Sequence, residues 1–232
     1  MLRFIKKFGL VLVVLIIQPV SFLHAHPHYV IIANWPFNDN LARKYKKHAT
    51  IVALDGAVNH LVERGWAPDF ILGDFDSITQ TAKKHFQNLK VPFIPTPDQS
   101  MTDIEKGVQF CAERGAKTIT LVCALGGNRN DHSFANLSLL RRHHGKGYKV
   151  NIETENEVIE FLKDEVAIRK AAIGGKFGLF GFPKAIATVD ALEWPLNNFV
   201  LEMGWQESAC NIIKKPLVTI YISGEALMIL PR

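Results

Sequence analysis

The sequence predicts a parallel-sheet α/β domain followed by a smaller all-β domain, which we expect to be a β-sandwich. From residue 29 to about 150, short apolar runs alternate with amphipathic helical stretches, and this alternation is typical of a parallel sheet. From 151 to 232, short β-rich segments separated by turn residues replace the helical period. A chain of 232 residues, 48% of them hydrophobic, is long enough to bury a core in each domain.

Residues 1–28 look like a leader. Three basic residues (Arg3, Lys6 and Lys7) precede an apolar run that is too short to span a bilayer comfortably. The segment is therefore a signal peptide, an anchor, or an extension produced by a start codon assigned too far upstream. The three cysteines are few, odd in number and far apart, which indicates buried thiols of a reducing compartment and argues against export.

In the α/β part, five apolar runs read as strands, and each ends in polar or turn residues. They cover 29–33, 50–54, 70–72, 91–94 and 118–123. A Rossmann-like parallel sheet is the expected result, with helices in the connections.

Four helices are predicted between these strands. Asp39 is expected to cap the first, and the second runs through 59–64. Thr102 and Glu105 form a capping box that starts the third helix. The fourth is expected to begin at an Asp131 cap and to end at Gly145. Its predicted apolar face consists of Phe134, Leu137 and Leu140.

The β-rich part contains six predicted strands. They cover 157–162, 165–169, 177–180, 185–189, 218–222 and 226–230. Ser223-Gly224 predicts a hairpin turn between the last two.

Acidic residues gather where the predicted parallel strands end. They are Asp55, Asp74, Asp76, Asp98, Asp103 and Asp131. Because a parallel sheet brings the carboxyl ends of its strands to one edge, these acids should lie together. Clustered carboxylates favour a bound Mg²⁺, which commonly brings phosphates with it.

A glycine loop supplies the complementary part of a phosphate site. Gly126 and Gly127 allow close approach of the backbone, and Arg129 offers a positive fork before a helix N-terminus. The net charge of +5 is spread without a basic stripe and interleaved aromatics, so nucleic-acid binding is not expected.

Together these motifs resemble the thiamine pyrophosphokinase family, in a variant similar to the eukaryotic enzymes. The resemblance runs through 29–232 in order. It rests on Asn34-Trp35-Pro36, Asp55-Gly56-Ala57-Val58-Asn59-His60-Leu61, Gly73-Asp74-Phe75-Asp76-Ser77, Thr96-Pro97-Asp98-Gln99 with Thr102-Asp103, Arg129-Asn130-Asp131-His132, Leu192-Glu193-Trp194-Pro195-Leu196 and Ser208-Ala209-Cys210-Asn211.

The resemblance implies transfer of pyrophosphate from ATP to thiamine, giving thiamine diphosphate and AMP. It implies a catalytic, ATP- and Mg²⁺-binding domain at 29–150 and a thiamine-binding, dimerisation domain at 151–232. A homodimer with active sites shared between subunits is also implied, without a nucleic-acid partner. Membrane contact is expected only if the leader is retained, and an ATP-dependent reaction favours the cytoplasm.

The same resemblance implies roles for individual residues. The implied catalytic acids are Asp74, Asp76, Asp103 and Asp55, and the first three would also bind Mg²⁺. Either Asp74 or Asp103 would take the hydroxyl proton of thiamine. The implied ATP-binding residues are Asn34, Gly126, Gly127, Asn128, Arg129 and Asp131. The implied thiamine-binding residues are Asp98, Gln99, Trp194, Ser208 and Asn211.

Three positions depart from the family pattern, namely Ala57, Asn128 and Cys210. Asn128 tolerates the left-handed backbone, whereas a thiol at 210 is a weaker hydrogen-bond donor than a hydroxyl. Two other functions fit parts of the sequence. Asp74 could be the nucleophile of a Mg²⁺-dependent phosphohydrolase, or the chain could be a non-catalytic, exported thiamine-binding protein.

Overall fold

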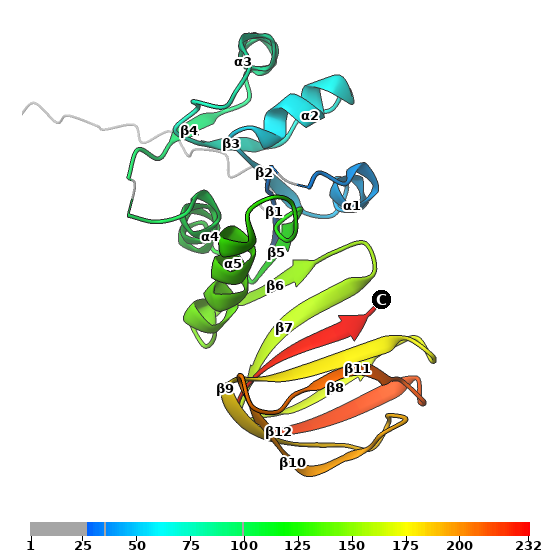
Figure 1. The fold of residues 1–232 in the computed structure, drawn as a ribbon. Coiled ribbons are helices and arrows are strands. Elements are labelled where there is room, and N and C mark those ends of the chain that lie inside the picture. The colour runs from blue at the N-terminus through cyan, green and yellow to red at the C-terminus, as the bar shows by residue number, and fades with distance from the viewer. Residues whose placement is uncertain (1–26, 35, 99) are drawn as a thin grey trace, which may run out of the picture.

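The computed structural model describes residues 27–34, 36–98 and 100–232, and Figure 1 shows an α/β part above a β-sandwich. The fold prediction is confirmed. The predicted leader lies almost wholly outside the described residues, and so does Gln99. Within the described ranges, no helix is long and apolar enough to cross a membrane.

The α/β part contains six parallel strands in the order β6-β5-β1-β2-β3-β4. They are β1 (His28–Ile32), β2 (Thr50–Leu54), β3 (Phe70–Gly73), β4 (Phe93–Pro95), β5 (Thr118–Val122) and β6 (Lys149–Glu153). Five helices connect them: α1 (Asp39–Lys44), α2 (Ala57–Glu63), α3 (Gln80–Asn88), α4 (Asp103–Glu113) and α5 (Asn130–His143). Helix α3 was not predicted.

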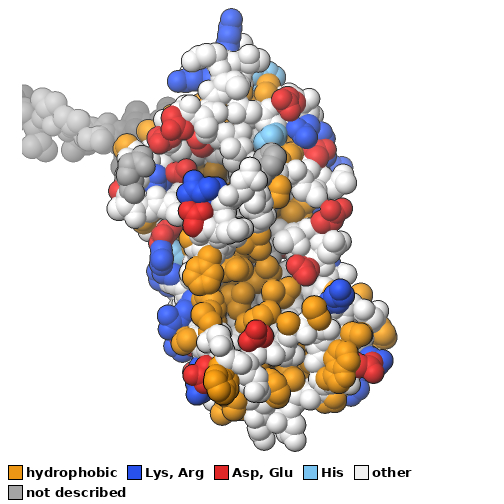
Figure 2. Space-filling view, viewed as in Figure 1, with side chains coloured by type: hydrophobic (Ala, Val, Ile, Leu, Met, Phe, Trp, Pro, Cys, Tyr) orange, Lys and Arg blue, Asp and Glu red, His pale blue; other side chains and the backbone are white. Residues whose placement is uncertain are grey.

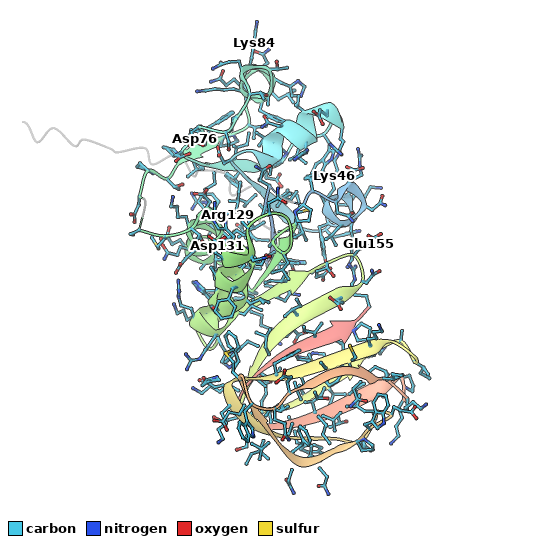
Figure 3. The ribbon with its side chains drawn as sticks, in the orientation of Figure 1. Lys46, Asp76, Lys84, Arg129, Asp131 and Glu155 are labelled. Atoms are coloured by element: carbon cyan, nitrogen blue, oxygen red, sulfur yellow. The ribbon has the colours of Figure 1, made fainter. Side chains whose placement is uncertain are left out.

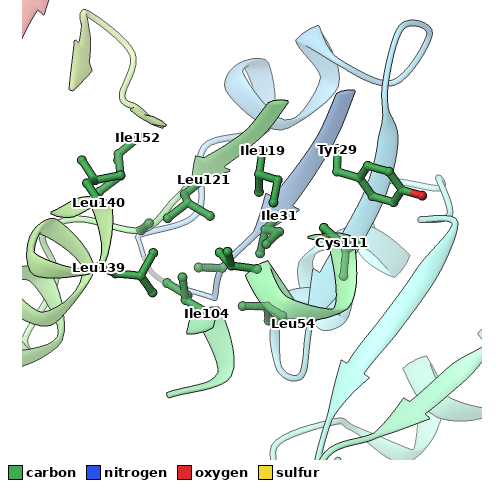
Figure 4. Close-up of a cluster of buried hydrophobic side chains, with 14 of the residues drawn as sticks. Tyr29, Ile31, Leu54, Ile104, Cys111, Ile119, Leu121, Leu139, Leu140 and Ile152 are labelled. Atoms are coloured by element: carbon green, nitrogen blue, oxygen red, sulfur yellow. The ribbon is translucent and has the colours of Figure 1, made fainter. Parts of the chain in front are cut away.

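Helices cover both faces of this sheet. Ile104, Val108 and Cys111 of α4 pack with Leu139 and Leu140 of α5 on one face, as Figure 4 shows in part. Apolar residues of α1, α2 and α3 form a second core on the other face. The predicted inward position of Phe134 is wrong. Its side chain is 57% exposed, and its ring lies 6.5 Å from that of Phe182 in the sandwich.

Two predicted helix caps and one half of the predicted capping box need correction. Asn38, not Asp39, caps α1, since its Oδ1 accepts a hydrogen bond from the Leu41 N–H at 2.9 Å. Asp131 lies in the first turn of α5 and is not its cap. Thr102 does cap α4, but the Glu105 carboxylate pairs with Arg142 instead of reaching back to the cap.

The sandwich is built from six strands around a third core. They are β7 (Glu157–Lys163), β8 (Val166–Lys170), β9 (Lys176–Val189), β10 (Leu196–Glu202), β11 (Ser208–Ile212) and β12 (Leu217–Pro231). The predicted hairpin at Ser223-Gly224 is wrong, because β12 continues through these residues with a register shift beside Gly224. Strand β9 likewise joins two predicted segments, and β10 and β11 were not predicted.

The two parts share one hydrogen-bonded sheet. Strand β6 pairs in parallel with β5, so the α/β part extends past the predicted boundary at 150 to Glu153. On its other side β6 pairs antiparallel with β7, through Ile152↔Ile159 and Glu153↔Val158. One continuous sheet thus joins the two parts. In the α/β part, the carboxyl ends of its parallel strands lie along one edge of this sheet.

Candidate functional site

Three of the predicted acids meet at the carboxyl edge of the sheet. Asp55 follows β2, while Asp74 and Asp76 follow the neighbouring strand β3, and Leu54 pairs with Leu72 just before them. One carboxylate oxygen from each of Asp55, Asp74 and Asp76 lies within 4.8 Å of the other two. We call these residues the acid trio. Asp55 is buried, whereas Asp74 and Asp76 are exposed, and Figure 3 shows Asp76 at this end of the α/β part.

Close backbone packing explains the glycines beside the trio. A Cβ on Gly73 would lie 2.9 Å from the Cβ of Asp55. A Cβ on Gly56 would lie 2.5 Å from Asn34 Nδ2 and 3.0 Å from Ser77 Oγ. Asn34 is thereby placed beside the acid loops. The Asp-Gly and Gly-Asp dipeptides are needed because the two strand ends approach too closely for larger residues.

Asp55 is the most constrained member of the trio. Ser77 Oγ donates a hydrogen bond to its Oδ2, while Oδ1 is buried and has no hydrogen-bond partner among the described residues. Burial raises the pKa of Asp55 against the lowering effect of the Ser77 bond, and the charges of Asp76, Asp74 and Asp103 raise it further. A bound cation would satisfy a carboxylate oxygen in this position. Three convergent carboxylate oxygens, one of them unsatisfied, fit a hard divalent ion such as Mg²⁺.

Asn59 holds the loop that carries Asp74 and Asp76. Its Nδ2 donates to the Ser77 carbonyl at 2.9 Å, and its Oδ1 accepts from both the N–H and the hydroxyl of Thr79 at 2.9 Å. Asn59 belongs to a motif named above, but its role in holding this loop was not predicted from the sequence. Asn59 lies four residues after Asp55, in the first turn of α2. This spacing, about one helical turn, could have indicated that its side chain lies near the acidic loops.

Asp103 and Asp98 do not belong to the acid trio. Asp103 is the first residue of α4, and its Oδ1 accepts a hydrogen bond from Lys106 Nζ at 3.0 Å. Asp98 accepts hydrogen bonds from the N–H and the hydroxyl of Ser100, at 2.8 and 2.9 Å, and these bonds lower its pKa. Metal binding by Asp103 and thiamine binding by Asp98 stay predictions.

The glycine loop lies between β5 and α5. Gly126 and Gly127 both have positive φ (88° and 74°), as a backbone that turns back toward a helix N-terminus requires. Two α5 side chains hold the loop, since Ser133 Oγ accepts from the Gly126 N–H at 3.0 Å and Asn136 Nδ2 donates to the Ala124 carbonyl at 2.7 Å. The loop is thus fixed by the helix that follows it. Asn128, the predicted ATP-binding residue that departs from the family pattern, directly follows the two glycines.

Arg129 and Asp131 form an exposed pair at the start of α5 (Figure 3). The guanidinium donates two hydrogen bonds to the carboxylate, at 2.9 and 2.7 Å, and this contact holds the pKa of Asp131 well below its usual range. The Asp131 carboxylate therefore occupies the two guanidinium N–H donors of Arg129 that a phosphate would otherwise bind.

The predicted thiamine residues of the sandwich form a separate group. Asn211 accepts from the Trp194 N–H at 3.2 Å and donates to the Trp194 carbonyl at 2.8 Å, and its Nδ2 lies 3.4 Å from Ser208 Oγ. Asn211 and Ser208 are buried, whereas the Trp194 side chain is 60% exposed. Buried Asn211 therefore fixes the backbone that presents the indole. Figure 1 places β11 in the sandwich, away from β3 in the α/β part, so one chain does not bring these residues to the acid trio.

Known proteins match this chain in sequence. Residues 41–152 match the family described as thiamin pyrophosphokinase, catalytic domain. Thiamine pyrophosphokinase 3 of Oryza sativa subsp. japonica is 28% identical over 180 residues, which cover 72% of this chain and 67% of that protein. Thiamin pyrophosphokinase 1 of Caenorhabditis elegans is 41% identical over 115 residues, which cover 45% and 43%. The chain thus spans about two thirds of the rice protein's length and less than half of the nematode protein's.

A solved structure shows the same fold. Thiamin pyrophosphokinase from Candida albicans superposes with a TM-score of 0.78 at 22% identity, over 92% of this chain and 91% of the other. The sequence match covers the acid trio and the glycine loop, and the structural match extends across the sandwich. The chain belongs to the thiamine pyrophosphokinase family.

Proposed function

We propose that this chain transfers a pyrophosphoryl group from ATP to the hydroxyethyl oxygen of thiamine, giving thiamine diphosphate and AMP. The observation that carries the proposal is the acid trio, in which the buried Asp55 keeps one oxygen without a hydrogen-bond partner among the described residues. Such a site needs a cation, and the glycine loop at the same sheet edge suits a polyphosphate. The names of the rice and nematode relatives support the choice of thiamine as acceptor.

Asp55, Asp74 and Asp76 would hold Mg²⁺, with Asp103 at the start of α4 as a further candidate. When bound, the ion would offset negative charge on the transferring phosphates. The backbone N–H groups of the glycine loop bind phosphate oxygens. Arg129 exchanges its Asp131 partner for phosphate, which places its positive fork against the transferring group.

The chain's carboxylates handle the proton. The thiamine hydroxyl loses its proton to Asp74 or Asp103 as its oxygen forms a bond to the β-phosphorus of ATP. The bond from that phosphorus to the oxygen of the α-phosphate breaks, and AMP leaves with that oxygen. Trp194 offers a flat, electron-rich face to the cationic ring system of thiamine. Asp98 and Gln99 are proposed to bind thiamine from the segment that precedes α4.

A homodimer would unite the two groups of site residues. Within one chain, Ser208 and Asn211 lie on β11, and Asn211 binds the Trp194 backbone. Figure 1 places β11 in the sandwich, away from β3 and the acid trio, so a second copy would have to supply these residues. Figure 2 shows hydrophobic side chains gathered on the surface where the α/β part meets the sandwich, and exposed apolar surface of this kind marks an interface. Because the reaction consumes ATP, we propose that the protein works in the cytoplasm.

The test is product identification with purified protein, ATP, Mg²⁺ and thiamine. Formation of thiamine diphosphate and AMP in equal amounts, dependent on all three additions, is the expected result. Phosphate release that does not depend on thiamine would support a phosphohydrolase with Asp74 as nucleophile. Thiamine binding without turnover would support a binding protein.

A further inference from the structure

Lys106 is a buried cation beside the candidate site. It is the fourth residue of α4, and its side chain is only 6% exposed. Its Nζ donates to Asp103 Oδ1 and to the Thr96 carbonyl, each at 3.0 Å. These two oxygens belong to different elements, since Thr96 follows β4 and Asp103 begins α4.

This is an unfavourable place for a lysine unless both contacts are made. The N-terminal turn of a helix is the positive end of its dipole, which repels a cation. Burying an ammonium group is also unfavourable unless it is paired and hydrogen-bonded. The placement is therefore stable only while the Asp103 carboxylate and the Thr96 carbonyl stay where the structure has them.

The two contacts join the two ends of the segment whose described residues are 96–98 and 100–103. This segment contains Asp98, whose pKa is lowered by the Ser100 hydrogen bonds and, to a smaller degree, by the charge of Lys106. Lys106 binds one oxygen of Asp103, and no other side-chain hydrogen bond to Asp103 occurs among the described residues. The ammonium thus ties both ends of the segment together and fixes the direction of the Asp103 carboxylate.

We propose that Lys106 is a positioning residue of the site: it joins Thr96 to the start of α4 and aims Asp103 at the substrates. The inference rests on the proposed function for its kinetic consequences, but its structural part stands on the contacts alone. Lys106 acts through Asp103 and the segment, without touching the reacting atoms.

The experiment compares Lys106→Met with the matched control Lys84→Met on the exposed side of α3 (Figure 3). Methionine has a side chain of similar length to lysine but carries no charge. In substrate-free protein, hydrogen exchange at 98 and 100–103 should accelerate at least tenfold in Lys106→Met and stay unchanged in Lys84→Met. Unchanged exchange in a folded Lys106→Met protein overturns the inference, whatever the activity of the wild type.

Kinetics then test the link to Asp103. In Lys106→Met, kcat/KM for thiamine should fall at least tenfold, and adding Asp103→Asn should cost little more than Asp103→Asn alone. Lys106→Arg, which keeps the charge, should recover part of the loss and guards against a folding defect in the Met variant. Fully additive effects of the two substitutions would overturn the inference. Absence of thiamine diphosphate formation by the wild type would instead refute the proposed function.

Discussion

Replacing Asp76 by Asn should stabilise the cation-free protein while abolishing its turnover. Two unit charges 4.8 Å apart repel by about 3.5 kcal/mol at an effective dielectric constant of about 20. Asp74 and Asp76 are exposed, so water and salt reduce the repulsion that Asp76 adds to the trio to about 1 kcal/mol. Asn is nearly isosteric with Asp, so removing the charge leaves the packing of the loop intact.

Urea unfolding with and without MgCl₂ measures this effect. The wild type should gain stability on addition of Mg²⁺, because an ion that binds only the folded state stabilises it. Asp76→Asn should be about 1 kcal/mol more stable than the wild type without Mg²⁺ and should gain little from it. Glu207→Gln, which removes an exposed charge in the sandwich, is the matched control and should behave like the wild type.

Two results would refute the reasoning. One is an Asp76→Asn protein that is less stable than the wild type in the absence of Mg²⁺, or that gains as much stability from the ion. The other is near-normal formation of thiamine diphosphate by the variant, which would show that the acid trio does not serve the reaction.

Three further perturbations test other parts of the structure. Gly56→Ala should cost about 1 kcal/mol of stability but most of the turnover, because its Cβ would meet Asn34 Nδ2 at 2.5 Å; a variant with normal turnover would contradict the close packing described above. Because burial raises the pKa of Asp55, the folded protein keeps its proton to higher pH than the unfolded chain, so this group lowers the stability of the Mg²⁺-free protein as the pH rises above 3.8. Urea midpoints measured across pH should show that Asp55→Asn does not lose stability in this way as the pH rises. Identical pH profiles for the variant and the wild type would contradict this role of Asp55. Asn211→Ala should lower the free energy of unfolding by about 1–3 kcal/mol, because the backbone groups of Trp194 lose their partners; an unchanged urea midpoint would exclude this role.

Five of the six parallel strands, and three of the six acids expected at one sheet edge, could be predicted because strand ends in a parallel sheet follow from hydrophobic periodicity; β6 and α3 were missed. Asp55, Asp74 and Asp76 were placed together on that basis, and the structure brings them within 4.8 Å. The ion pairs could not be foreseen. The Lys106–Asp103 contact depends on side-chain directions at the start of a helix, and the Arg129–Asp131 pair on a loop conformation.

The sandwich was harder to predict for a different reason. Its long strands bend, and turn-forming residues lie inside them. Ser223 and Gly224 have the chemistry of a hairpin, yet pairing with β9 on both sides of Gly224 keeps β12 continuous. Phe134 likewise has helical spacing, but a neighbouring strand of the sandwich, and not the α/β core, supplies its contact.

The pairing of β6 with β7 has a consequence for cutting the chain in two. Each strand forms an edge that the other covers, through Ile152↔Ile159 and Glu153↔Val158. A fragment that ends after β6, or one that begins at β7, would present an unpaired row of backbone donors and acceptors to its neighbours in solution. Such edges recruit further strands from other molecules. The separated halves should therefore aggregate at concentrations where the whole chain stays dispersed.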